Sequence, residues 1–321
     1  IIDTLAPALN PAWTALASTP TALPTPRLAD LKATVVAGLP PTPTPDSHSL
    51  PQPGEIEIAV MPLVVSPEAQ SLWAVYSLGM GFHDPDQGHF VALYTQTDEG
   101  WQQLDRILLA SCAEYVNDGA LAQVEMEPGR IWLEHQSAAG AHSGCYDLLS
   151  YDGQALAVEA SNSSSNPGAG WLADLDGDGL LEVILDHTEY YVFCYACGVR
   201  LPRFQVLRWD GERLIGVELE PLPDSVPEEV WRLNDRAVEL ALAGLWKQAQ
   251  STISEALALD FQEQQYASTV RWNAALIDLH AEATGAQAED GAFPLLDHVF
   301  YGDYAAAVDQ LRRYSLEEIW G

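Results

Sequence analysis

Four acidic side chains within nine consecutive residues are the clearest sign of chemistry in this sequence. Asp174, Asp176 and Asp178 occupy alternate positions, and Glu182 follows four residues later. Carboxylates this close together repel one another unless a hard cation lies among them, and Ca²⁺ takes about six to eight oxygen ligands. The two glycines inside the stretch allow the backbone to turn tightly and direct the oxygens inward. We therefore predict a Ca²⁺ site here.

The predicted ligands are the carboxylates of Asp174, Asp176, Asp178 and Glu182 and the backbone carbonyl of Leu180. An EF-hand loop would need a bidentate Glu at its last position and a helix after it. That position, counted from Asp174, is occupied by Leu185, which offers no side-chain ligand. The following run, Leu-Leu-Glu-Val-Ile-Leu, is apolar and β-branched, which predicts a strand rather than a helix.

The spacing Asp-x-Asp-x-Asp-Gly-x-x-Glu from Asp174 to Glu182 resembles the calcium loop of FG-GAP/VCBS repeats, where the last position is usually Asp. The resemblance covers this one loop. It implies a strand–loop–strand element of the kind found in integrin-type β-propellers, with Ca²⁺ bracing the fold and not performing chemistry. An acidic turn without a metal is the alternative.

The charge balance is strongly acidic, with 46 Asp and Glu against 14 Lys and Arg and a net charge of −32. Such a chain repels nucleic acids and anionic membranes and suits cation binding or simple colloidal solubility. No stretch is long and apolar enough to span a membrane. Because the sequence begins at Ile1 without Met, we expect a mature chain whose leader was removed, although a truncated chain would look the same.

Four cysteines are present, an even number that favours disulfides and an oxidising compartment. We predict the pairs Cys112–Cys145 and Cys194–Cys197. The Cys-x-x-Cys spacing of the second pair leaves two alternatives open, half of a zinc site and a redox-active or free thiol pair.

Composition and periodicity divide the chain into three parts. Residues 1–53 are rich in Pro, Thr and Ala and predict an extended arm, with apolar residues that would anchor it to a surface and a short helix at Ala29–Ala37. Residues 54–221 predict β-structure. Residues 228–321 change to a helical period.

The β-domain contains a repeat of about fifty residues, marked by turns at Gly100, Gly153 and Gly211. Each turn follows a strand pattern, and an earlier hairpin pattern precedes each. Two hairpins per unit predict a four-stranded sheet, like the blade of a propeller. Three units are too few for a typical closed propeller, so we expect a propeller-like fragment or a β-sandwich.

The helical part contains the pattern Gly-x-aromatic-x-x-Ala around Gly244, which resembles a tetratricopeptide (TPR) unit with Gly244 in the turn between its two helices. Gly302, Tyr304, Ala307 and Leu311 form a weaker echo. The resemblance implies a helical solenoid whose groove binds peptides. A plain helical cap on the β-domain is the alternative.

No catalytic motif is recognisable, so we predict no enzyme and no catalytic residue. The loop at residues 82–89 holds His83, Asp84, Asp86 and His89, but at no familiar metal or acid–base spacing, and we expect a polar surface turn. The sequence thus favours a non-enzymatic, calcium-stabilised extracellular or cell-surface protein. We expect it to assemble into a filament or array through its N-terminal arm, or to bind other surface proteins through the arm and the helical groove. The alternative is a secreted carbohydrate-binding protein or hydrolase tethered by the Pro-rich segment.

Overall fold

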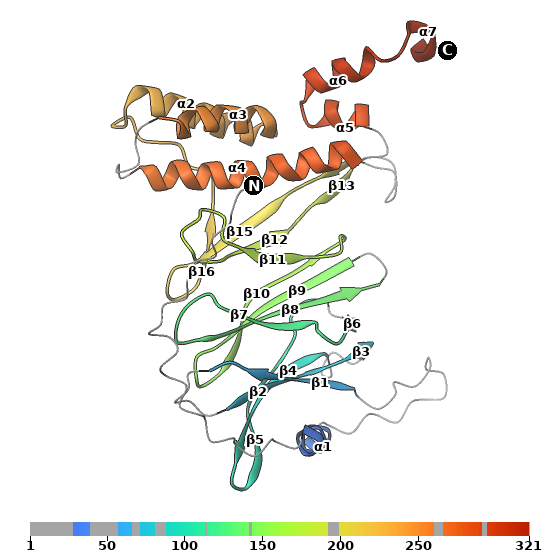
Figure 1. The fold of residues 1–321 in the computed structure, drawn as a ribbon, viewed down its shortest axis with the longest axis vertical. Coiled ribbons are helices and arrows are strands. Elements are labelled where there is room, and N and C mark those ends of the chain that lie inside the picture. Colours follow the sequence, from blue (N-terminus) through green and yellow to red (C-terminus); the bar gives the residue numbers. More distant parts are fainter. Residues whose placement is uncertain are drawn as a thin grey trace, which may run out of the picture.

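The computed structural model describes residues 28–38, 57–65, 71–80, 88–112, 114–140, 143–191, 199–259, 266–290 and 294–320. Antiparallel sheets occupy the first two-thirds of the chain and helices the remainder (Figure 1). The change occurs between Val217, where the last strand ends, and Glu228, where a helix begins, as the change of sequence period predicts.

Three antiparallel sheets form the β-domain, and each contains four strands that pair in the order in which they occur along the chain, with short strands inserted between consecutive strands of sheets 1 and 3. Sheet 1 consists of β1 (Ile58–Leu63), β2 (Leu72–Ser77), β4 (Phe90–Thr97) and β5 (Gly100–Leu108). Sheet 2 contains β7 (Leu121–Val124), β8 (Ile131–Ala139), β9 (Ser143–Tyr151) and β10 (Leu156–Ser164), with the short strands β3 (Gly79–Met80) and β6 (Tyr115–Val116) at its edge. Sheet 3 consists of β11 (Gly170–Ala173), β12 (Glu182–Asp186), β15 (Phe204–Trp209) and β16 (Leu214–Val217). A separate ribbon pairs β13 (Glu189–Tyr191) with β14 (Val199–Leu201).

The last hairpin of each sheet turns at the glycine that marks the sequence repeat. Gly100, Gly153 and Gly211 have φ angles of +124°, +96° and +102°, a region that side chains disfavour. They lie in the β4–β5, β9–β10 and β15–β16 connections, respectively. The predicted four-stranded units are therefore present, and the glycines are required where the chain reverses.

The three sheets are stacked face to face, with an apolar core in each gap (Figure 1). Between sheets 1 and 2 lie Leu93, Leu133 and Leu149, all fully buried. Between sheets 2 and 3, Trp132 is fully buried and its ring meets Trp209 edge-on at a centroid distance of 4.9 Å. Alternate residues of β8 thus serve two cores, because successive side chains of a strand point to opposite faces.

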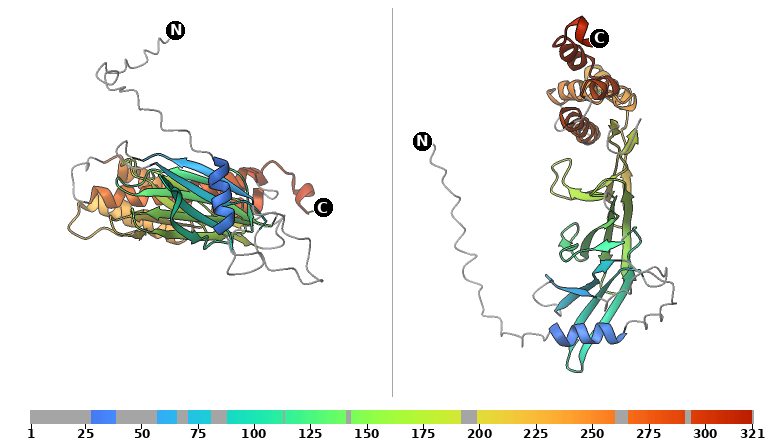
Figure 2. Two further views of the ribbon diagram at one scale, coloured as in Figure 1. Left: turned by 90° about the horizontal axis from the view of Figure 1, so that it is seen from below. Right: turned by 90° about the vertical axis from the view of Figure 1, so that its right-hand side faces the viewer.

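Helices cover both ends of this stack (Figures 1 and 2). Helix α1 (Leu28–Gly38) lies on the outer face of sheet 1, where Leu31 and Val35 are buried against Phe90 and its neighbours. Helix α4 (Ala267–Asp290) lies on the outer face of sheet 3, where Leu276 packs with Ile184 and Val206. Both outer faces are therefore buried, and the described strands form no closed barrel.

The helix predicted at Ala29–Ala37 is confirmed as α1, within the segment assigned to the arm. The remainder of the predicted arm, residues 1–27 and 39–53, lies outside the described residues. The predicted helix near Gln262–Glu282 corresponds to α4, which begins at Ala267 and continues to Asp290.

The remaining described helices are α2 (Glu228–Leu242), α3 (Trp246–Leu257), α5 (Pro294–Phe300), α6 (Tyr304–Leu311) and α7 (Leu316–Trp320). Gly244 separates α2 from α3 with a φ of +77°, and Gly302 separates α5 from α6 with a φ of +73°. Both glycines thus lie in turns between paired helices, where the sequence pattern expects them. Within the parts of the chain that the structure describes, no helix is both apolar and long enough to cross a membrane.

A disulfide joins Cys112 to Cys145 on β9, as predicted. It holds the β5–β6 connection against sheet 2, where the Ser111 backbone N–H donates to Asp147 Oδ1 at 3.0 Å. Cys194 and Cys197 lie outside the described residues.

His280 of α4 forms a hydrogen bond that connects this helix to sheet 3. Its Nε2 accepts the backbone N–H of Phe204 at 3.3 Å, and its Nδ1 donates to the Leu276 carbonyl at 2.8 Å. The ring stacks on Trp246 with centroids 4.2 Å apart. This arrangement requires a neutral imidazole, and burial lowers the pKa of His280 below the ordinary 6.5.

The contribution of His280 to stability should therefore fall as the pH drops from about 7 to about 5, because its imidazole binds a proton more readily in the unfolded state than in the folded state. The difference between wild type and a variant without this imidazole isolates that contribution from those of other titrating groups. His280→Phe should flatten this profile. At about pH 7 it should also cost about 1–3 kcal/mol, because the Phe204 N–H loses its acceptor. Urea unfolding across this pH range checks both effects, with exposed His187→Phe as the control. Parallel profiles for wild type and His280→Phe would contradict the assignment.

Candidate metal centre

The acidic loop connects β11 to β12 at one end of sheet 3. Its boundaries are fixed by strand pairing, with Ala173 opposite Glu182 at the last position of the ladder. The strand β12 is buried along its whole length, and Val183 and Ile184 face opposite cores. The carboxylate of Glu182 thus projects from a fixed strand, whereas the aspartates belong to the loop.

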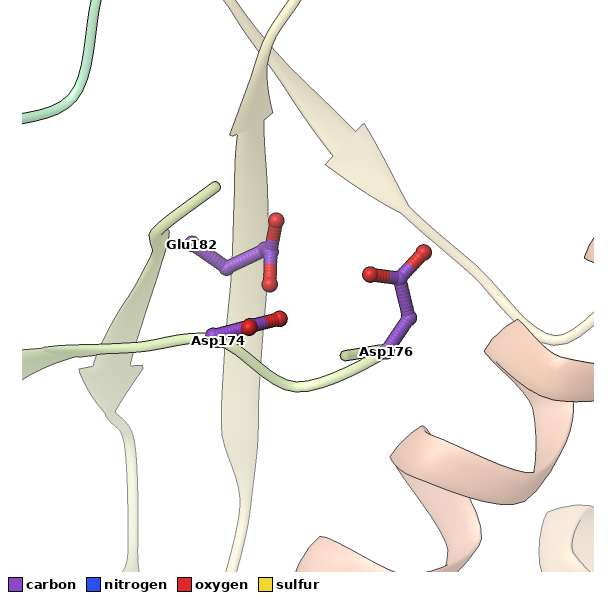
Figure 3. Close-up of side chains that lie close together, drawn as sticks. All are labelled: Asp174, Asp176 and Glu182. Carbon is purple, nitrogen blue, oxygen red and sulfur yellow. The ribbon is translucent and has the colours of Figure 1, made fainter. Parts of the chain in front are cut away.

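Three of the predicted ligands converge. Asp174, Asp176 and Glu182 each offer one carboxylate oxygen, and these oxygens all lie within 4.8 Å of one another (Figure 3). Glu182 is only 2% exposed, whereas Asp174 is exposed and Asp176 is half-buried. The group therefore has a buried base and an open side that faces solvent.

Backbone hydrogen bonds hold the loop in a tight curl. Asp174 accepts the N–H of Gly177 at 2.8 Å and that of Gly179 at 3.0 Å. These glycines have φ angles of +76° and +89°, where a side chain would be strained. The loop is thus shaped by its own sequence.

Asp174, Asp176 and Glu182 concentrate negative charge in a small volume, and the described residues around them offset it only in part. Burial, followed by the charges of Asp176, Asp178 and Asp174, raises the pKa of Glu182 to about 7, despite the hydrogen bond from the Leu175 N–H. Burial and the neighbouring aspartates also raise the pKa of Asp176. A bound divalent cation would favour the ionised form of both groups.

The donor set fits a hard cation. All three convergent groups supply carboxylate oxygens, the ligand type that Ca²⁺ prefers. One oxygen of Glu182 is engaged by the Leu175 N–H at 2.9 Å, which fixes the direction of the other. Bound Ca²⁺ would offset two of the three negative charges of the ionised group and tie the loop to β12.

The predicted ligand Asp178 is not in this group of side chains. Asp178 Oδ1 instead accepts the N–H of Leu180 at 2.8 Å within the turn. The predicted contribution of Leu180 is its backbone carbonyl, which lies outside a comparison of side-chain ligands and stays a prediction. The charge of Asp178 still acts on the site, where it contributes to the raised pKa of Glu182.

Two further residues, which the ligand pattern did not identify, connect the loop to the helical part. Leu175, between two of the ligands, packs into the core formed by Ile184, Val206 and Leu276 between sheet 3 and α4. Arg271 of α4 acts on Asp176 through its charge and offsets part of the rise in the pKa of that carboxyl, which burial mainly causes. The role of Leu175 could have been suspected from the sequence, because an apolar residue inside an acidic loop suggests burial. Arg271 lies 95 residues from Asp176, and nothing in the sequence indicated that the two would interact.

A second cluster of polar side chains is buried between sheets 1 and 2. His89 is buried and its Nδ1 lies 2.9 Å from Ser77 Oγ, so the expectation of a surface position was wrong for this residue. His135 and Asp147 are also buried, with Nδ1 and Oδ2 4.0 Å apart, and burial lowers the pKa of His135 to about 4. His83, Asp84 and Asp86 lie outside the described residues.

A shallow depression of about 260 Å³ lies at the β6–β7 turn and β8, lined by Asn117, Asp118, Gly119, Ala120, Ala122, Glu134 and Gln136. Burial raises the pKa of Glu134. The depression therefore places a carboxyl with a raised pKa near a second carboxylate, Asp118.

Comparison of the sequence with models of known protein families and with curated proteins finds no match. The functional argument therefore rests on the arrangement of the residues themselves.

Proposed function

We propose that this protein is a calcium-stabilised, non-enzymatic structural or interaction protein of the cell exterior or cell surface. The observation that carries the proposal is the convergence of Asp174, Asp176 and Glu182 around a buried carboxylate. A cation there would act as a brace, because the loop that holds these carboxylates connects sheet 3 to helix α4.

The position of the loop supports this bracing role. Leu175 packs against the core that joins sheet 3 to α4, and Asp176 lies within electrostatic reach of Arg271. Fixing the loop would therefore also fix the contact between the β-domain and the helices.

The Cys112–Cys145 disulfide supports an oxidising compartment, because such bonds persist mainly in exported proteins. The Pro-rich N-terminal arm supports assembly with other copies, because its first part is apolar and nearly uncharged in an otherwise acidic chain. We propose that the arm links copies into a filament or array.

Calorimetric titration with Ca²⁺ tests the metal site directly. Wild type should bind about one Ca²⁺ at the loop, and Asp174→Asn/Asp176→Asn should abolish that binding because it removes two of the three convergent carboxylates. Asp98→Asn/Glu99→Gln, in the exposed β4–β5 turn, changes the net charge equally and should bind like wild type. Equal heats for both double variants would show that Ca²⁺ only accumulates on an acidic surface.

A second candidate function, carbohydrate binding or hydrolysis, is favoured by the depression containing Asp118 and Glu134. Calorimetric titration of soluble oligosaccharides into wild type and into Glu134→Gln distinguishes this candidate from a purely structural role. Saccharide binding that Glu134→Gln abolishes would favour this candidate over a purely structural role.

A further inference from the structure

Exposed apolar side chains gather at the C-terminal helices. Of the fourteen large hydrophobic residues that are exposed in the described chain, seven lie between residues 299 and 316. They are Val299, Phe300, Tyr304, Val308, Leu311, Tyr314 and Leu316, with exposures from 37% to 76%. So many exposed apolar side chains in one short segment of a protein with a net charge of −32 indicate an interaction surface.

Three of these side chains lie on one face of α6. Tyr304, Val308 and Leu311 follow the spacing i, i+4, i+7, which places them in a row along a helix. Ala307, in contrast, is 4% exposed and belongs to the packed side of the helix. We call the row of Tyr304, Val308 and Leu311 the α6 stripe.

The α6 stripe is held in place by contacts at the start of its helix. Asp303 caps the helix by accepting the N–H of Ala306, and it pairs with Lys247 Nζ of α3 at 2.5 Å. Gln248 Nε2 also donates to the Gly302 carbonyl at 2.7 Å. Since three contacts fix this end, the exposure of the stripe is a property of the folded protein and not of a frayed end.

The first 27 residues of the chain have the chemistry to cover the stripe. They contain the large apolar residues Ile1, Ile2, Leu5, Leu9 and Trp13. Their only charges are Asp3 and Arg27, which cancel, so the net charge of −32 belongs entirely to residues 28–321. This segment can therefore approach an acidic molecule without net repulsion. Extended, 27 residues span at most about 90 Å, which suffices to reach a neighbouring molecule.

We propose that the α6 stripe, with the adjoining Val299 and Phe300 of α5, receives residues 1–27 of a second copy of this chain. The proposal rests on the self-assembly proposed above and names the surface that accepts the arm. Helix α1, to which residues 1–27 connect, lies at the opposite end of the long axis from α6 (Figures 1 and 2). Donor and acceptor at opposite ends produce a head-to-tail contact, which propagates when it does not close into a ring.

Two full-length variants test the proposal by complementation. The acceptor variant, Tyr304→Ala/Val308→Ala, keeps its arm, and the donor variant, Leu5→Ala/Leu9→Ala, keeps its stripe. Sedimentation velocity should show wild type forming chains. Each variant alone should need at least about tenfold more protein to associate, because loss of a buried interface anchor weakens binding by that factor or more. Leu242→Ala, exposed by 75% on α2, is the matched control and should associate like wild type.

An equimolar mixture of the two variants should form dimers and nothing larger, because only one intact arm and one intact stripe can meet in each pair. If the donor variant still associates while the acceptor variant does not, the stripe pairs with itself and the proposal is overturned. If only the acceptor variant still associates, the arm docks elsewhere, which also overturns it. A wild type that stays monomeric at every concentration would instead refute the self-assembly on which the proposal rests.

Discussion

Amide hydrogen exchange in sheet 3 and in α4 should slow about a hundredfold when Ca²⁺ is present at roughly 100 times its dissociation constant. The effect should include the amides of Ile184, Val206 and Leu276, which belong to the core between the sheet and the helix. The reason is structural. Leu175 lies between two carboxylates of the metal centre and packs into this same core, so a fixed loop keeps the core closed.

Sheet 1 and α1 provide an internal control for this experiment. Helix α1 and sheet 1 lie at the opposite end of the stack from α4 (Figure 1). Leu31 and Phe90 belong to the core between them, and the exchange of their amides should change much less if opening of the α4 contact precedes global unfolding. Asp174→Asn/Asp176→Asn should remove the response to Ca²⁺ throughout. Protection confined to residues 174–182 would show that the cation orders only its own loop and leaves the helices unaffected.

Loss of the Cys112–Cys145 bond should lower the free energy of unfolding by about 3–4 kcal/mol, the value expected for freeing a loop with a sequence separation of 33. Cys112→Ala/Cys145→Ala is the suitable change, because Cys145 is buried and a hydroxyl there would be costly. The loss should also release Ser111 from Asp147, whose hydrogen bond depends on the same segment. Guanidinium unfolding measures the difference.

Cys194→Ala/Cys197→Ala separates this bond from any effect of the second cysteine pair. Reductant should destabilise that control by the same amount as it destabilises wild type if Cys112–Cys145 is the important bond. A variant lacking Cys112 and Cys145 that unfolds at the wild-type denaturant concentration would show that the sheet contacts alone hold the β5–β6 connection.

The repeat of the β-domain was predictable because its signals are local. Gly100, Gly153 and Gly211 must reverse the chain with positive φ angles, so their spacing shows where each hairpin turns. The helical turns at Gly244 and Gly302 were predictable for the same reason. The way in which the sheets stack could not be predicted. A strand such as β8 has buried residues on both faces, and its sequence does not indicate which sheet each face will contact.

The metal centre shows the same division. The alternating carboxylates and the glycines of residues 174–182 predicted a curled acidic loop, because both depend on neighbouring residues. The sequence did not determine that Asp178 would bond to the Leu180 N–H and not join Asp174, Asp176 and Glu182. That choice depends on the exact curl of the backbone, which the pairing of Ala173 with Glu182 sets.

By itself, then, the sequence determined the change from β-structure to helices, the turns that mark the repeats and the acidic loop, because backbone preference and short-range spacing specify them. The Cys112–Cys145 pair was also predicted, although the two cysteines are separated by 33 residues and meet only through the fold. The tertiary structure decided which surfaces meet. It buried His89, placed Arg271 near Asp176 and Leu175 under α4, and left Tyr304, Val308 and Leu311 exposed. These outcomes follow from packing between residues far apart in the chain, since the burial of each face depends on which other face covers it.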